Sequence, residues 1–155
     1  MSHRALSSNH FATCPKQIIL QNAAEAIVDG RSAIVMSYME LRKTVKSLGI
    51  KGMEVHHLIE KRFAKTLGID PDDIPSILLP KGDHQTITKA FRKLIGYSND
   101  INSEVTTKYA SVEKIWSVIK EVYNKNGMEQ YIPIIEEFLQ INSSKFGNIR
   151  IWKID

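Results

Sequence analysis

Apolar residues recur at every third or fourth position along most of the chain, which is the pattern of helices that bury one face. A helix is also predicted from Pro15 to Val28, since proline suits a first helical turn and Asp29-Gly30 follows. The other apolar stripes cover residues 34–48, 87–95, 105–123 and 131–139. The pattern therefore predicts a predominantly helical protein.

The pattern changes between residues 52 and 96. "MEVHHLI" and "SILLP" are short apolar runs bounded by glycine or proline, which indicates two short strands. Between them, "EKRFAKTLG" is predicted to be helical and "IDPDDIP" to be a turn. A helix capped by Asp83 is predicted after the second strand, and the alternation in "GNIRIWKID" suggests a terminal strand. The predicted fold class is α+β, with a strand–loop–strand–helix unit at about 52–96.

A length of 155 residues suits one domain with its own core. Residues 1–13 are polar and aperiodic and are predicted to be a flexible arm, which leaves 14–155 as a single domain. No apolar run approaches the roughly 18 residues of a membrane span. The first residues also lack the apolar run of a secretory signal peptide. The sequence leaves the oligomeric state open.

Charge and cysteine content narrow the possible chemistry. The net charge of +4 and the pI near 9.1 are compatible with a polyanionic partner. The single cysteine, Cys14, excludes an internal disulfide and a multi-cysteine zinc cage. A bound metal ion would have to be held by histidine and carboxylate side chains.

Two adjacent histidines, His56 and His57, lie in the first predicted strand. Neighbouring side chains on a strand point to opposite faces, so the two rings are not expected to do the same job. His84 is predicted in the first turn of the helix after the second strand. If the two strands pair, this helix start comes beside the histidine pair. Each histidine also has a simpler interpretation, as a hydrogen-bonded residue of the core.

The order of these features carries a resemblance to a known family. "EVHHLIEKRF" followed by "SILLPKGDHQTITKAFRKLI" resembles the HNH/endonuclease VII nucleases found as C-terminal toxin modules of bacterial polymorphic toxins, in contact-dependent inhibition and Rhs systems. The resemblance covers roughly residues 40–97. It implies a ββα-metal core at about 52–96, embedded among flanking helices. It also implies that His56 and His84 are metal ligands and that His57 is the general base.

The resemblance leaves the ligand set incomplete. Some family members carry a second helical histidine one turn after the first, where this chain has Thr88. Water, Asp83 or Glu54 remain as further ligands. Glu54 lies two residues before His56 on the same strand face, where it is expected to ligate or to orient that ring, or simply to be a solvated charge. The implied cofactor is one divalent metal ion, with zinc, magnesium and manganese all open.

Arg92 lies two helical turns after His84 on nearly the same face. It is the candidate for binding a substrate phosphate, with a solvated helix face as the alternative. The resemblance implies a metal-dependent endonuclease that cleaves DNA. It would be a delivered antibacterial effector that acts in the cytoplasm of a target bacterial cell and is neutralised by a cognate immunity protein. Two alternatives stay open: an RNA-cleaving toxin of the same fold, and a non-enzymatic helical interaction domain with a structural metal site.

Overall fold

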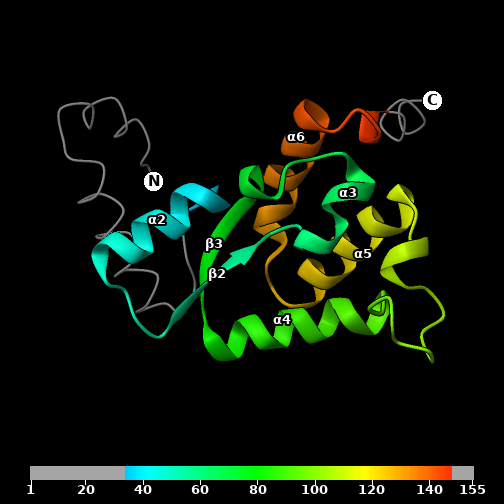
Figure 1. Ribbon diagram of the computed structural model, residues 1–155, viewed down its shortest axis with the longest axis horizontal. Coiled ribbons are helices and arrows are strands. Elements are labelled where there is room, and N and C mark those ends of the chain that lie inside the picture. Colours follow the sequence, from blue (N-terminus) through cyan, green and yellow to red (C-terminus); the bar gives the residue numbers. More distant parts are fainter. Residues whose placement is uncertain (1–33, 148–155) are drawn as a thin grey trace.

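The computed structural model describes residues 34–147. Within this range, three strands form an antiparallel sheet in the order β1-β3-β2, and the rest is mostly helical (Figure 1). The strands are β1 (Met36–Ser37), β2 (Met53–His57) and β3 (Pro75–Pro80). The prediction of a predominantly helical α+β fold is confirmed. The predicted arm, the predicted helix at 15–28 and most of the predicted terminal strand lie outside the described residues.

Five α-helices and four short 3₁₀ turns accompany the sheet in the described range. The helices are α2 (Tyr38–Leu48), α3 (Ala64–Leu67), α4 (Lys81–Leu94), α5 (Val112–Lys125) and α6 (Ile132–Asn142). The 3₁₀ turns are η2 (Lys61–Phe63), η3 (Pro71–Asp73), η4 (Thr107–Tyr109) and η5 (Glu129–Tyr131). As predicted, Gly49 and Gly68 end α2 and α3, with φ angles of 66° and 68° that suit glycine best. None of the helices in this range combines the length and the apolar character needed to cross a bilayer.

The two faces of the sheet contact different helices (Figure 1). On one face, Ile77 and Leu79 of β3 join the main hydrophobic core, which includes buried residues of α3, α4, α5 and α6. On the other face, Leu78 packs with Leu41 of α2 in a smaller cluster that also takes in Val55. This division follows from the alternation of side chains along a strand. The same alternation determines which of the two clusters each side chain of β2 faces.

Two predicted helical stripes begin later than their periodicity suggests. The first was predicted from Ile34, but Met36–Ser37 is extended and pairs with β3, and the Ser37 side chain accepts a hydrogen bond from the Glu40 amide at 3.3 Å. The second was predicted from Val105, but α5 begins at Val112, after the Ser111 side chain accepts from the Lys114 amide at 3.0 Å. In both cases a serine N-cap sets the start, because it satisfies an amide that lacks a helical partner.

The predicted Asp83 cap is also wrong. Helix α4 starts at Lys81, directly after Pro80, and its N-cap makes no side-chain hydrogen bond. Asp83 therefore lies inside the first turn, where a carboxylate still interacts favourably with the helix dipole. The earlier start follows from the close succession of β3 and α4, since Pro80 still pairs with Met53 in the sheet.

A tight loop connects α4 to η4. Within this loop, the Gly96 backbone packs closely against Ser103. The Gly96 amide donates to Val105 O at 2.8 Å, and the Thr107 amide donates to Gly96 O at 3.0 Å. A β-carbon at this position would overlap with Ser103 Oγ and lie 2.5 Å from Ser103 Cβ. We expect Gly96→Ala to lower the free energy of unfolding by about 1–3 kcal/mol, as overpacking does elsewhere. Urea unfolding measures the change.

Gly82 provides the matched control for this substitution. It lies in the first turn of α4, and a β-carbon there would have no atom within 4 Å. Gly82→Ala is expected to keep or raise stability by up to about 1 kcal/mol, because alanine is the better helix former. Equal effects of the two substitutions would contradict the close approach of Gly96 to Ser103.

Candidate functional site

Three of the five side chains predicted as functional come together at the junction of β2 and α4. The rings of His56 and His84 lie with their centroids 5.2 Å apart and their planes at 71°. His84 Nδ1 lies 2.6 Å from Glu54 Oε1. Because α4 continues directly from β3, and β3 pairs with β2 along its length, the first turn of α4 lies beside β2. The strand–strand–helix order predicted from the sequence therefore brings Glu54, His56 and His84 into one cluster.

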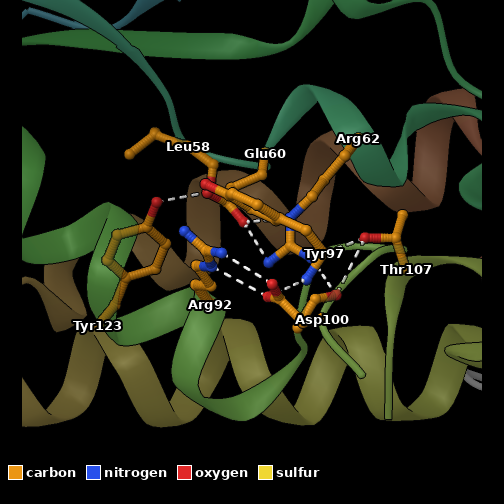
Figure 2. Close-up of polar contacts among 9 residues, drawn as sticks. Leu58, Glu60, Arg62, Arg92, Tyr97, Asp100, Thr107 and Tyr123 are labelled. Atoms are coloured by element: carbon orange, nitrogen blue, oxygen red, sulfur yellow. Dashed lines mark hydrogen bonds and ion pairs between the residues drawn. The ribbon is translucent and has the colours of Figure 1, made fainter. Parts of the chain in front are cut away.

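His56 is the buried member of this cluster, with only 2% of its surface exposed. Its Nε2 lies 2.9 Å from the hydroxyl of Tyr123 on α5. That hydroxyl donates to Leu58 O at 2.6 Å, as Figure 2 shows. Burial, with smaller contributions from His84 and His57, lowers the pKa of His56 from 6.5 to about 3. In the metal-free protein at neutral pH, His56 is therefore a neutral ring.

His84 and Glu54 form the more accessible part of the cluster, with side chains 30% and 39% exposed. An ionised carboxylate can only accept hydrogen bonds, so His84 Nδ1 is the donor in this contact. The contact orients the imidazole, and in the neutral ring it leaves Nε2 as the nitrogen with the lone pair. Carboxylate–histidine pairs of this kind commonly orient metal-binding imidazoles.

His57 lies on the opposite face of β2. Its ring stacks on Tyr38 of α2, with centroids 3.7 Å apart and an angle of 12° between planes. Its Nε2 is buried and has no hydrogen-bond partner among residues 34–147. Burial, and then the charges of Lys61 and His84, lowers its pKa to about 4. The structure does not place His57, the predicted base, in the cluster of Glu54, His56 and His84.

Arg92 is engaged by a neighbouring loop. Its guanidinium binds both carboxylate oxygens of Asp100, at 2.9 and 2.7 Å, and lies 4.3 Å from the centre of the Tyr97 ring (Figure 2). The hydrogen bond from Arg92, and then that from the Tyr97 amide, lower the pKa of Asp100 to about 2. Arg92 lines an open hollow of about 550 Å³ together with Lys89 and Lys93. A phosphate at Arg92 would have to compete with Asp100 for the guanidinium.

Two polar residues near the cluster, Tyr123 and Glu60, were not predicted from the sequence to have a role there. Tyr123 was assigned to an apolar stripe, although its hydroxyl makes the contact with His56. Glu60 is mostly buried, which raises its pKa, and its carboxylate pairs with Arg62 at 2.8 Å. The available signals were the hydroxyl that a tyrosine brings to a mostly apolar stripe, and the opposite charges of Glu60 and Arg62 between the apolar residues Ile59 and Phe63.

The side chains of this cluster are of the right kind for a divalent metal ion, but they do not complete a ligand set. Imidazole nitrogens suit zinc and related ions. Two imidazoles bound at about 2.0–2.1 Å to one tetrahedral ion would have ring centres about 5 Å apart, close to the spacing of His56 and His84. Within residues 34–147, however, no group of three or more histidine, cysteine, aspartate and glutamate residues is arranged to hold a metal ion. Water or substrate oxygens would have to supply the remaining ligands.

No protein-family model, curated protein or solved structure matches this chain.

The buried, neutral state of His56 predicts that folding of the metal-free protein is sensitive to acid. Its pKa is lowered on folding, so the unfolded chain takes up a proton that the folded chain excludes. This contribution to stability is complete above pH 6.5 and is lost as the pH falls toward 3. Between pH 6.5 and about 4.5, we expect His56 alone to lower the free energy of unfolding by about 2–3 kcal/mol, measured by urea unfolding as the difference between the wild-type protein and a variant without this histidine.

His56→Gln is the control for this pH dependence. Glutamine does not titrate, so the variant should lose the part of the acid sensitivity that His56 contributes and keep the part that His57 and other groups contribute. A variant with the same pH dependence as the wild-type protein would show that His56 is not the group responsible.

Proposed function

We propose that this chain is a metal-dependent endonuclease that hydrolyses phosphodiester bonds of DNA. The observation that supports the proposal is the convergence of His56 from β2 and His84 from the start of α4, with their rings 5.2 Å apart. This strand–strand–helix arrangement agrees with the ββα-metal core that the sequence resemblance implies. The net charge of +4 is compatible with a polyanionic substrate.

The proposal gives each residue of the cluster a separate task. His56 and His84 would hold the ion through one nitrogen each, and Glu54 would keep the His84 ring in place through its 2.6 Å contact. A divalent ion at this position neutralises charge on a phosphate oxygen and stabilises the leaving oxygen. The open side of the cluster, at Glu54 and His84, is where a phosphate would approach, since His56 is almost fully buried.

His57 is the general base in this proposal. A neutral imidazole can accept a proton from water, and the lowered pKa keeps the ring neutral at cellular pH. The ring is stacked on Tyr38 on the opposite face of β2, so it would have to leave this stack and turn toward the cluster to reach a water molecule there. Arg92 would release Asp100 and bind a neighbouring phosphate of the substrate instead.

The biological role in the proposal is that of an antibacterial toxin domain. It would be delivered into the cytoplasm of a target bacterial cell and held inactive in the producing cell by a cognate immunity protein. The resemblance of residues 40–97 to toxin nucleases supports this role.

Incubation of plasmid DNA with the purified protein tests the proposal. We expect nicked and linear plasmid in the presence of Mg²⁺, Mn²⁺ or Zn²⁺, and intact plasmid after addition of EDTA. The variant His57→Ala should fold and bind metal but lose cleavage. If the wild-type protein binds these ions and leaves the plasmid intact with all of them, the proposal is wrong for DNA. Total RNA, incubated in parallel, tests the RNA-cleaving alternative.

A non-enzymatic helical interaction domain is the second candidate. It is favoured by the absence of a three-ligand group in the described range and by the stacking of His57 on Tyr38. In that case His57→Ala would lower thermal stability, and neither nucleic acid would be cleaved.

A further inference from the structure

The contact between Tyr123 and His56 has only one possible direction. The hydroxyl of Tyr123 carries a single proton, and it donates this proton to Leu58 O at 2.6 Å, because a backbone carbonyl can only accept. The same hydroxyl lies 2.9 Å from His56 Nε2. With its own proton committed, the hydroxyl can only accept there, so Nε2 must carry the proton.

This assignment fixes the other nitrogen of the ring. A neutral imidazole has one protonated and one unprotonated nitrogen, so with Nε2 protonated the lone pair is on Nδ1. Within residues 34–147, His56 Nδ1 makes no hydrogen bond, which leaves its lone pair available. In free neutral histidine both tautomers are accessible, and here the Tyr123 hydroxyl selects one of them.

Packing keeps the Tyr123 hydroxyl in place. Tyr123 is completely buried, and Phe91 of α4 packs edge-on against its ring with centroids 5.6 Å apart. Burial, and the nearby charge of Glu60, raises the pKa of Tyr123 well above its usual value of 10, so the hydroxyl keeps its proton. The buried ring holds the hydroxyl between Leu58 O and His56 Nε2, so the hydroxyl cannot turn its proton toward His56 without losing the hydrogen bond to Leu58 O.

We propose that Tyr123 is a positioning residue that holds His56 in the Nε2–H tautomer, so that Nδ1 is the nitrogen offered to a metal ion. The tautomer itself follows from the hydrogen bonds, and only its use in metal binding rests on the proposed function. The residue comes from α5, outside the strand–strand–helix unit that carries the histidines. The same principle orients metal-binding histidines elsewhere, where a partner of the second nitrogen fixes the ring.

Nuclear magnetic resonance of the ¹⁵N-labelled, metal-free protein tests the tautomer directly. At neutral pH, two-bond ¹H–¹⁵N correlations of the wild-type protein should show His56 protonated at Nε2 and unprotonated at Nδ1. Protonation at Nδ1 would overturn the inference, whether or not any variant folds. In Tyr123→Phe the ring should shift toward a mixture of both tautomers.

The metal-binding part is tested by titrating Zn²⁺ into the metal-free proteins and measuring heat. Tyr123→Phe should bind Zn²⁺ about 10–100-fold more weakly than the wild-type protein, the usual effect of removing a partner of a ligating histidine. An unchanged affinity would overturn the positioning role.

Ser143→Ala is the matched control. Its buried hydroxyl also donates to a backbone carbonyl, Leu67 O at 2.5 Å, but among residues 34–147 it has no hydrogen bond to a histidine. This variant should lose stability in the way that Tyr123→Phe does and keep the tautomer and the Zn²⁺ affinity unchanged. If Ser143→Ala weakened Zn²⁺ binding equally, the effect would be one of general destabilisation and the positioning role would be wrong. A wild-type protein with the Nε2–H tautomer that cleaves no nucleic acid would refute the proposed function and still support the tautomer assignment.

Discussion

His84→Ala is expected to reduce metal-dependent plasmid cleavage about a thousandfold. The substitution removes one of the two imidazoles that would hold the ion, and a bound ion stabilises the transition state of phosphoryl chemistry by several kcal/mol. His84 and Glu54 are both partly exposed, so the loss of their contact should cost at most about 1 kcal/mol of stability. We therefore expect His84→Ala to fold normally and to lose its cleavage activity. The initial rate of plasmid nicking and the thermal unfolding midpoint measure the two effects.

Gln85→Ala is the control for this variant. Gln85 is the next residue on α4. It is exposed and takes no part in the contact between His84 and Glu54. It should leave the rate of nicking unchanged. If His84→Ala kept wild-type activity, neither the metal role of His84 nor the cluster as a catalytic site could be maintained. His56 is less suitable for this test, because its burial makes loss of activity and loss of stability difficult to separate.

Arg62→Met is expected to lower the free energy of unfolding by about 3 kcal/mol or more at neutral pH. The guanidinium pairs with Glu60 at 2.8 Å and donates to Gly96 O and Thr107 Oγ1 at 3.1 and 2.7 Å (Figure 2). Both charged side chains are largely buried, at 16% and 13% exposed. Removing one partner leaves the other charge buried and unpaired, which is among the most destabilising changes known.

The pH dependence of this loss identifies its cause. Burial already raises the pKa of Glu60, and removal of Arg62 raises it further, so the folded variant takes up a proton more readily than the unfolded chain. The destabilisation should therefore be largest at neutral pH and shrink as the pH falls and Glu60 is protonated. Urea unfolding at several pH values measures this trend. The double variant Arg62→Met/Glu60→Gln should recover part of the loss at neutral pH.

Arg92→Met is the matched control for Arg62→Met. Its ion pair with Asp100 is as short as that of Arg62 with Glu60, but the Arg92 side chain is half exposed. An exposed ion pair contributes little to stability, so Arg92→Met should have a much smaller effect. Equal losses for the two variants would mean that burial does not determine the effect of Arg62.

The sequence predicts most elements of this fold, because apolar spacing and glycine or proline boundaries are local signals. Strand β2, strand β3 and helix α4 lie where the pattern predicts them. The two errors at 34–37 and 105–111 share one cause. An apolar stripe shows which residues can share a helix face, whereas the start of the helix depends on a capping side chain, here Ser37 and Ser111.

The candidate site was predictable only in part. Strand alternation separates His56 from His57, and the order of the elements brings His84 beside His56, so both follow from the sequence. The sequence does not predict the stacking of His57 on Tyr38 or the hydrogen bond from His56 to Tyr123. They join residues that are far apart in the chain, and no periodic pattern encodes which aromatic residue meets which histidine.

The hydrogen bond between Tyr123 and His56 also bears on any attempt to transplant this site. A short peptide that spans only β2, β3 and α4 would carry Glu54, His56 and His84 but would lack the phenol that determines which nitrogen of the His56 imidazole is basic. A minimal portable version of the cluster must therefore extend through α5, or else a designer must graft a substitute donor–acceptor group opposite Leu58 O.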